Sequence, residues 1–421
     1  MRTARLAAAG AAARAPADAR PTILFAHRGE DWIRGAEQCL LDLVERLDRT
    51  RFRPVVVCDA PTLVRAVEAL DAPVLHLPRW GRSPVTAART RRVVRAVMAD
   101  ERVALVHANM PDVLPVVAPA AYGRYVPVLT HLHVPYLSTG ERHRVLVRRS
   151  ALTVGVAEHV VAPLRGEVAD PSRVRVVPNA VHDARLQAGE ARALRAGLGI
   201  APSACVAAVV GSLIPRKGQE VALRALASAR AAGADVHLLV CGEGPDREAL
   251  RALTGTLDVA DAAHFLGMRP DVGAVLRDAA DLLVSAAREE ALPLNVLEAQ
   301  WLGLPVIASD IPAHREALEP GVTGIVVAPD DAAALAAALV ALAADPARRT
   351  ALGAAGRARA RARYAMPRYV GAFEALYAEL LAAPRRAYGG PPGSDWPRAL
   401  GSWLRIGVER KLRALRPPPR R

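Results

Sequence analysis

Residues 281–309 have the pattern of a buried strand, a loop, a helix and a second buried strand. No other feature of the sequence restricts the possible fold classes as strongly. The run Asp281 to Ser285 is apolar enough for a strand inside a sheet. Pro293 marks the loop, and apolar residues recur at helical spacing from Asn295 until Gly303 ends the helix. Two buried strands joined by a helix predict a parallel sheet, and therefore an α/β fold.

The same alternation continues along most of the chain and predicts two α/β units. Short apolar runs alternate with helical Ala, Leu and Arg patterns on both sides of a connector at residues 183–202. The strands predicted before it are 22–26, 54–58, 74–77, 104–108, 126–130, 152–155 and 174–177. Those predicted after it begin at Val206 and then span 235–241, 264–266, 281–285, 306–309 and 324–327.

Two carboxylates flank the start of the helix in the 281–309 segment. Glu290 lies in the loop at the carboxyl end of the strand, and Glu298 lies about one turn inside the helix. Open α/β sheets bind ligands at this edge, where free helix amides favour a phosphate and carboxylates accept hydrogen bonds from hydroxyls. The segment therefore suits a ligand that is anionic and rich in hydroxyls, such as a nucleotide sugar. The alternative is that Glu298 is the N3 partner of an Asn295 N-cap and Glu290 a solvated loop residue.

Lysine is rare in this chain, which has 54 arginines and only Lys217 and Lys411. Lys217 occupies another loop between a strand and a helix, between Gly211 and Gly218. A compact ammonium on a flexible stem suits a diphosphate, and the two glycines let the backbone approach it. The alternative is an ordinary solvated loop lysine.

These residues lie within a larger set of motifs, whose order resembles that of retaining glycosyltransferases of the GT-B fold, family 4. The motifs of the C-terminal half are Gly211 to Gly218, Leu239 to Pro245, Phe265 to Gly267, Glu290 with Glu298, Gly303 to Asp310, and Gly321 to Gly324. The N-terminal half is similar more loosely, through Gly35 to Glu37, Pro127 to His133 and Val176 to Asn179. The resemblance implies two Rossmann-like α/β domains facing each other across a cleft.

The resemblance also implies roles for individual residues. Lys217, with Arg216 as a second charge, would bind the donor diphosphate, Glu290 would face the transferred sugar, and Glu298 would bind the ribose. Gly35 would let the first loop approach the pyrophosphate, and His133 would lie near the sugar and the acceptor. The implied catalytic residues are Lys217, Glu290, His133 and Arg216. The donor site is completed by the distal-phosphate loop Leu292, Pro293, Leu294, Asn295 and Val296, and by Gly211, Ser212, Gly242 and Leu266.

Some positions depart from the family pattern. Ser212 stands where the family usually has arginine, and Arg216 would supply the missing charge from a different place. Ala291 and Ala180 stand where glycines are usual, and Arg34 replaces the first glycine of the pair in the first loop. We expect these changes to bear on rate and donor identity more than on reaction class.

The predicted domain boundaries follow from the strand pattern and composition. They are a disordered leader at 1–20, an N-terminal Rossmann-like acceptor-side domain at 21–182, the connector at 183–202, a C-terminal Rossmann-like nucleotide-sugar-binding domain at 203–365, a returning helix at 366–383 and a basic Pro/Gly/Arg-rich tail at 384–421. The leader has a weak Ala-rich core, which makes a poor signal-peptide h-region.

Four cysteines lie in or beside apolar runs without short spacing, as buried free thiols of a reducing compartment do, and we expect neither disulfides nor a metal site.

The tail carries +8 and the leader +3 of the formal charge of +14, which leaves +3 for the folded body. With 4% aromatic residues, that body offers little for nucleic acid.

The sequence of the tail predicts an amphipathic helix. Residues 396–416 place two tryptophans and several aliphatic residues on one face of a helix, and arginines on the other. This pattern suits an anionic membrane surface; the alternative is a disordered Arg-rich tail. We expect a cytoplasmic protein, peripheral at the inner face of the plasma membrane if the tail binds lipid.

The predicted activity is metal-independent transfer of a sugar from a UDP- or GDP-linked donor to an acceptor hydroxyl, with retention at the anomeric carbon. We expect a hexosyltransferase-like enzyme of cell-surface polysaccharide or glycolipid synthesis, with no cofactor besides the nucleotide sugar and an unknown glycan, lipid-linked or small-molecule acceptor. Three alternatives remain open: a retaining glycosidase using Glu290 and Glu298, a nucleotide-sugar 2-epimerase, and a catalytically weak homologue that binds nucleotide sugar or membrane as a partner subunit.

Overall fold

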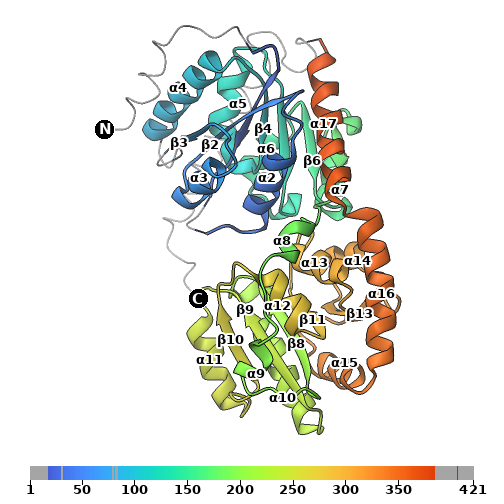
Figure 1. Cartoon of the computed structure of the whole chain (residues 1–421). Coiled ribbons are helices and arrows are strands. Elements are labelled where there is room, and N and C mark those ends of the chain that lie inside the picture. The colour runs from blue at the N-terminus through green and yellow to red at the C-terminus, as the bar shows by residue number, and fades with distance from the viewer. Residues whose placement is uncertain (1–17, 30–31, 78–79, 81–83, 385–404, 406–421) are drawn as a thin grey trace, which may run out of the picture. The chain divides into compact units, whose positions relative to one another are not determined.

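The computed structural model describes residues 18–29, 32–77, 80, 84–384 and 405. The chain divides into two compact units (Figure 1). Unit 1 comprises residues 1–131, 140–153 and 374–421, and unit 2 comprises residues 132–139 and 154–373. The predicted leader and the tail helix at 396–416 fall almost wholly outside the described residues.

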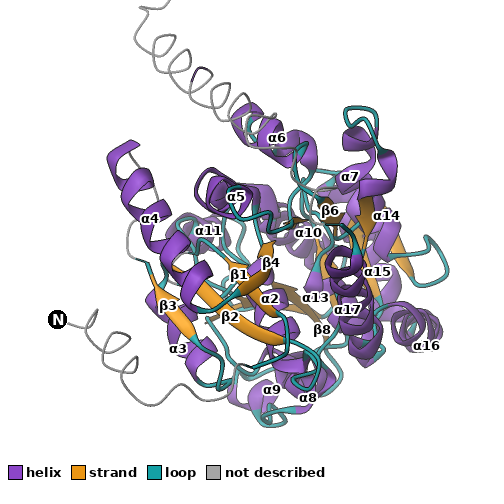
Figure 2. Ribbon diagram, turned by 90° about the horizontal axis from the view of Figure 1, so that it is seen from above, coloured by secondary structure: helices purple, strands orange, loops and turns teal. Residues whose placement is uncertain are grey.

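The first sheet has seven strands in the order β3-β2-β1-β4-β5-β6-β7. Its strands are β1 (Thr22–Ala26), β2 (Arg53–Cys58), β3 (Val74–His76), β4 (Val103–Ala108), β5 (Val128–Leu132), β6 (Leu152–Gly155) and β7 (Val174–Val176). Strand β1 pairs in parallel with both β2 and β4, and these strands lie side by side in Figure 2. The strand order reverses between β1 and β4, which makes that point a topological switch.

The second sheet has six strands in the order β10-β9-β8-β11-β12-β13. Its strands are β8 (Cys205–Val210), β9 (Val236–Cys241), β10 (Ala263–Gly267), β11 (Leu282–Ser285), β12 (Val306–Ser309) and β13 (Gly324–Val327). Each of these strands pairs in parallel with its neighbours, and the switch point of the sheet lies between β8 and β11. The predicted parallel α/β fold is confirmed, and each predicted strand is present with ends shifted by at most two residues.

Helices connect the strands of both sheets. Up to residue 200 they are α2 (Gly35–Arg46), α3 (Pro61–Glu68), α4 (Pro84–Asp100), α5 (Leu114–Tyr122), α6 (Glu141–Val147), α7 (Glu158–Arg165), α8 (Asp183–Gln187) and α9 (Leu194–Gly197). Beyond it they are α10 (Gln219–Ala231), α11 (Arg247–Thr256), α12 (Val272–Ala279), α13 (Leu294–Leu302), α14 (Pro312–Ala317), α15 (Ala332–Ala344), α16 (Pro346–Arg363) and α17 (Met366–Ala382). The predicted connector at 183–202 therefore contains two short helices.

The second sheet is buried on both faces, which explains why its strands are apolar runs without alternation. In β9, Leu238 and Val240 pack into one core with residues of α10 and α15, whereas Leu239 packs on the other side with residues of α12. Full burial of each such side chain contributes about 1.5–3 kcal/mol. The buried sheet is therefore rigid, and it fixes the positions at which its loops begin.

The four cysteines are buried free thiols, as predicted. Burial raises the pKa of Cys58 and of Cys241 to about 12 in each case. Within the described part of the chain, no helix combines the length and apolarity required to span a bilayer.

Helix α17 ends in unit 1, where two of its buried residues form hydrogen bonds with that unit. Glu374 accepts a hydrogen bond from the amide of Asp48 at 2.8 Å and pairs with Arg51 at 2.9 Å. Tyr377, fully buried, shares a 2.6 Å hydrogen bond with Nδ1 of His107, and burial raises the pKa of its phenol. These polar contacts, together with edge-on packing against Phe25, fix the last turns of α17 on the unit.

We predict that Tyr377→Phe loosens the end of α17, because it removes the buried hydrogen bond to His107 Nδ1 at a cost of about 1–3 kcal/mol. Hydrogen exchange of the α17 amides should become faster by a corresponding factor. Ala378→Ser changes an exposed position on the same helix and should leave exchange nearly unaltered. Equal protection in wild type and Tyr377→Phe would show that the hydrogen bond does not hold the helix.

Candidate functional site

The candidate site of unit 2 lies at the switch point of the second sheet. Strands β8 and β11 are parallel neighbours, so their carboxyl ends meet at one edge. The loop after β8 carries residues 211–218, and the loop after β11 runs through Glu290 into α13. The amide of Arg288 donates to the carbonyl of Arg216 at 2.8 Å, which ties the two loops together.

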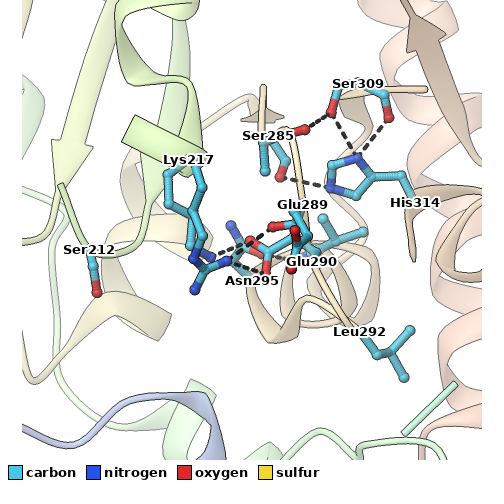
Figure 3. A network of polar contacts seen from close by, with 12 residues as sticks. Ser212, Lys217, Ser285, Glu289, Glu290, Leu292, Asn295, Ser309 and His314 are labelled. Atoms are coloured by element: carbon cyan, nitrogen blue, oxygen red, sulfur yellow. Dashed lines mark hydrogen bonds and ion pairs between the residues drawn. The ribbon is translucent and has the colours of Figure 1, made fainter. Parts of the chain in front are cut away.

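At this edge the structure brings together two cations and a carboxylate that the sequence singled out. Lys217 Nζ donates to Glu290 Oε1, and Arg216 Nη1 lies 3.4 Å from Glu290 Oε2 (Figure 3). Arg216 also donates to the carbonyl of Glu289 at 3.0 Å. The side chains of Glu290 and Lys217 are only 9% and 17% exposed, so water screens their attraction weakly. The ammonium and the carboxylate form the centre of the site.

Close backbone packing places these side chains. The 3-10 helix η5 (Pro215–Lys217) ends at Gly218, whose φ of +66° is left-handed. A Cβ there would lie 2.1 Å from the carbonyl oxygen of Ala286. A Cβ on Gly242, predicted as a donor-site residue, would lie 1.9 Å from the carbonyl oxygen of Gly211. The loops after β8, β9 and β11 therefore approach one another as closely as only glycine permits.

Helix α13 begins at Leu294 with Pro293 as its N-cap, so the interpretation of Asn295 as the N-cap is wrong. Asn295 lies inside the first turn, and its side-chain amide donates to the carbonyl of Val210 at 2.8 Å, which anchors the helix to β8. The amide of Val296, predicted to hold a phosphate, already donates to Asn295 Oδ1 and the Pro293 carbonyl. Within the described residues, the amides of Leu294 and Asn295 have no protein acceptor, as is usual in the first turn of a helix.

The second predicted carboxylate, Glu298, is paired with an arginine that the sequence did not single out. Arg185 of α8 donates through Nη2 to Glu298 Oε1 at 3.1 Å. The suggested capping pair of Glu298 with Asn295 is therefore also wrong. Asn179, buried, donates to the carbonyl of Leu292 at 3.0 Å and so fixes the loop before α13.

A buried histidine that sequence reasoning missed supports the Glu290 loop. His314 of α14 donates from Nδ1 to the carbonyl of Ser309 at 2.7 Å, and Ser285 Oγ lies 3.0 Å from its Nε2 (Figure 3). Ser309 Oγ in turn donates to the carbonyl of Ala287. Burial lowers the pKa of His314, so the ring is neutral and Nε2 accepts from Ser285. The network joins the ends of β11 and β12 beneath the loop that carries Glu290.

The remaining predicted residues lie outside the Lys217–Glu290 contacts. Ser212 is partly buried, and no dashed line joins its side chain to the network in Figure 3; its carbonyl accepts a 2.9 Å hydrogen bond from Gln219. Leu266 lies in β10, and His133, half-buried, follows β5 directly. Gly35 is the first residue of α2, in unit 1. The hydrogen bonds that join Lys217, Arg216 and Glu290 include none of these four residues.

Unit 1 has a polar network at its own switch point, which the sequence indicated only through Glu37. Asn109, just after β4, donates from Nδ2 to the carbonyl of Ala36 and to Nδ1 of His27, both at 3.0 Å. Because Nδ1 accepts, His27 carries its proton on Nε2 and donates it to Glu37 at 2.9 Å. The sequence could have indicated this network through His27 and Asn109, because each is a polar residue directly after a predicted strand.

Comparison with known proteins identifies the family. The family described as "Glycosyltransferase Family 4" matches residues 33–185, and the family described as "Glycosyl transferases group 1" matches residues 191–359. Together they cover most of both units in the order of the chain. The protein therefore belongs to the family 4 glycosyltransferases, which have the GT-B fold, as the sequence motifs predicted.

Named relatives resemble parts of the chain. The D-inositol 3-phosphate glycosyltransferase of Segniliparus rotundus is 35% identical over 197 residues, which are 46% of this chain and 44% of the relative. The GDP-mannose-dependent monoacylated alpha-(1-6)-phosphatidylinositol monomannoside mannosyltransferase of Corynebacterium glutamicum is 37% identical over 181 residues, which are 41% of this chain and 46% of that protein. The chain thus spans about half the length of the curated relatives it matches.

Solved structures agree on the fold. Anabaena HepE, crystallised with UDP and glucose, is 22% identical and superposes with a TM-score of 0.72 over 85% of this chain and 99% of its own. Sucrose-phosphate synthase from Thermosynechococcus elongatus is 21% identical, with a TM-score of 0.73 over 87% of this chain and 100% of its own. At these identities the likeness establishes the GT-B fold alone.

We predict that Gly218→Ala lowers the melting temperature and weakens ligand binding at the site, because the new Cβ collides with the Ala286 carbonyl and displaces the Lys217 loop. Gly233→Ala is the matched control, since Gly233 has a φ of +85° and no atom within 4 Å of where its Cβ would lie. It should cost only the left-handed strain, about 1–2 kcal/mol. If both variants lost the same stability, close loop packing would not be what Gly218 provides.

We also predict a pH-dependent contribution from His314. Burial lowers its pKa from the ordinary 6.5, so below pH 6.5 the unfolded chain binds a proton that the folded chain does not. The folded state therefore becomes less stable as the pH is lowered. Urea unfolding of His314→Asn and wild type should therefore differ more at pH 7.5 than at pH 5.5, by about 1 kcal/mol. A difference that stays constant between these pH values would contradict a neutral His314.

Proposed function

We propose that this protein is a retaining, metal-independent glycosyltransferase that moves a sugar from a nucleoside diphosphate sugar to an acceptor hydroxyl. The observation that carries the proposal is the contact of Lys217 with Glu290 beside the N-terminus of α13. An ammonium, a carboxylate and two helix amides without a protein acceptor lie at one sheet edge, and we propose that they bind the diphosphate, the sugar and the distal phosphate. Family membership supports the class of reaction.

The bond that breaks joins the anomeric carbon to a phosphate oxygen, and negative charge builds on the leaving diphosphate. Lys217, Arg216 and the amides of Leu294 and Asn295 would stabilise that charge. They supply the positive charge that a divalent cation provides in other phosphate chemistry. The proposed site therefore works without a metal.

Binding of the diphosphate requires an exchange of partners. The carboxylate of Glu290 accepts a hydrogen bond from Lys217, so the diphosphate competes with this carboxylate for the ammonium. Once released, Glu290 is free to accept hydrogen bonds from the hydroxyls of the sugar. The exchange couples arrival of the phosphate to recognition of the sugar.

Retention follows from attack on the face that the leaving group vacates. The acceptor oxygen bonds to the anomeric carbon as the bond to phosphate breaks, and the acceptor proton passes to the departing phosphate oxygen. This step uses no protein base, because the carboxylate of Glu290 accepts hydrogen bonds from the hydroxyls of the sugar after the diphosphate has displaced it from Lys217. His133 would lie on the acceptor side, at the end of β5.

The acceptor class is suggested by the relatives. The names of two of them specify D-inositol 3-phosphate and a phosphatidylinositol mannoside as acceptors. We propose a polyol or glycolipid hydroxyl of that kind, in cell-surface glycan or glycolipid synthesis. UDP- and GDP-linked sugars both remain donor candidates. Attachment of the tail at 396–416 to an anionic membrane remains part of this proposal.

Two competing functions make different predictions. A glycosidase needs Glu290 and Glu298 as a joint acid and nucleophile, but each is paired with a different cation, Lys217 and Arg185, which favours separate roles. A catalytically weak partner subunit is favoured by one observation, Ser212 in the usual place of arginine. Nucleotide-sugar binding without transfer to any acceptor would support that second role.

We predict opposite effects of two substitutions on nucleoside diphosphate binding, measured by isothermal titration with UDP and GDP. Lys217→Ala should weaken binding about 10- to 100-fold, because a charge-assisted hydrogen bond is lost. Glu290→Gln should tighten it, because the competing negative charge is removed, while sugar transfer falls. Arg224→Ala removes an exposed charge on α10 and should change affinity by less than about twofold.

The reaction itself is tested by nuclear magnetic resonance of products from UDP- and GDP-sugars with inositol and inositol phosphate acceptors. Retention requires an α-linked product from an α-linked donor. An inverted anomer would overturn the proposed stereochemistry, and weaker binding by Glu290→Gln would contradict the exchange of partners at Lys217.

A further inference from the structure

Arg185 contacts the carboxylate that the proposed function assigns to the ribose. Its Nη2 donates to Glu298 Oε1 at 3.1 Å, and the side chains are 27% and 12% exposed. Arg185 comes from α8, which is far from Glu298 in sequence. The contact therefore holds Glu298 from a segment outside the helix that carries it.

A second hydrogen bond fixes α8 to α13, and in this one the donor lies on α13 and the acceptor on α8. Trp301 Nε1 donates to Asp183 Oδ1 at 2.6 Å. Glu298 and Trp301 are three residues apart and therefore lie on one face of α13. The guanidinium of Arg361 lies over the Trp301 ring, 4.9 Å from its centre, and helps to fix the ring. Two polar contacts thus set the position of α8 along α13.

The other side of α8 rests on α12 without space to shift. Arg277 donates to the carbonyl of Leu186 at 2.8 Å and to that of Gly189 at 3.0 Å. A Cβ on Gly273 would lie 2.5 Å from the Cα of Leu186, so the two helices are in backbone contact there. The backbone that carries Arg185 is therefore held in place before any ligand binds.

A fixed arginine changes what Glu298 offers to a ligand. A free glutamate on a helix surface samples several rotamers, and binding must order it at an entropic cost. A carboxylate has two oxygens and about four acceptor positions, and a hydrogen bond from one arginine N–H uses one of them. Arg185 can therefore hold the carboxylate while Glu298 still accepts hydrogen bonds from hydroxyls.

We propose that Arg185 is a positioning residue that orients Glu298 for the ribose hydroxyls and so makes the site selective for ribonucleoside over 2′-deoxyribonucleoside diphosphates. The inference rests on the proposed function, because it needs a nucleoside diphosphate as ligand. Arg185 acts on the ribose through Glu298, so its loss alters discrimination between sugars and leaves the diphosphate contacts intact.

The experiment is isothermal titration of the full chain with UDP, 2′-deoxy-UDP, GDP, 2′-deoxy-GDP and inorganic pyrophosphate. We expect wild type to prefer the ribose form of its nucleotide by about tenfold or more, the value of a hydrogen bond to a charged group. Arg185→Gln should reduce that preference to less than about threefold while pyrophosphate affinity stays unchanged. Arg185→Lys, which keeps a donor without the planar fork, should retain an intermediate preference.

Trp301→Phe is the matched control, because it removes the other contact between α8 and α13 and leaves Arg185 and Glu298 in place. Its preference for ribose should equal that of wild type. An equal loss of preference in Trp301→Phe and Arg185→Gln would assign the effect to docking of α8 and overturn the inference. Tighter ribonucleotide binding by Arg185→Gln would also overturn it, since Arg185 would then compete with the ribose.

The outcomes separate this inference from the proposed function. If the folded wild type binds neither UDP nor GDP, the proposed function fails, and the inference fails with it. If wild type binds a nucleotide but does not distinguish its 2′-deoxy form, or if Arg185→Gln keeps the full preference, only the inference fails.

Discussion

The contact between Lys217 and Glu290 is the interaction on which the rest of the candidate site depends. It joins the loops after β8 and β11 at the edge where the parallel strands end. Because both side chains are largely buried, removal of Glu290 would take the counter-charge from Lys217, and removal of Lys217 would leave Glu290 with the longer contact to Arg216. Gly218, the His314 network and Asn295 hold the backbone around this pair, each from a different element. The site is therefore built before a ligand arrives.

The two carboxylates of the candidate site contact different cations, and the proposed function gives them different tasks. Glu290, in the loop before α13, contacts Lys217 and Arg216, and Glu298, about one turn inside α13, contacts Arg185. Each carboxylate is held by a charge from another segment of the chain. In the proposed function, the phosphate displaces the first partner, whereas the ribose binds beside the second. In this proposal, the Lys217–Glu290 contact breaks when the ligand binds, whereas the Arg185–Glu298 contact remains.

Much of this arrangement could be predicted from the sequence, for physical reasons. Buried parallel strands are apolar runs, so their positions were predicted to within two residues, and Lys217 stood out because arginine is the usual basic residue here. The alternative that made Asn295 an N-cap rested on the preference of asparagine for that position, but Pro293 is the N-cap and Asn295 contacts β8 instead. Arg185 and His314 were not predicted because their roles depend on contacts between distant segments, which spacing along the chain does not encode.

A crystal structure of the chain with UDP or GDP bound would test the central claim most directly. The account predicts a diphosphate against Lys217 Nζ and the amides of Leu294 and Asn295, Glu290 released from Lys217, and the ribose hydroxyls on Glu298. A nucleotide bound elsewhere, with the Lys217–Glu290 contact unbroken, would contradict it.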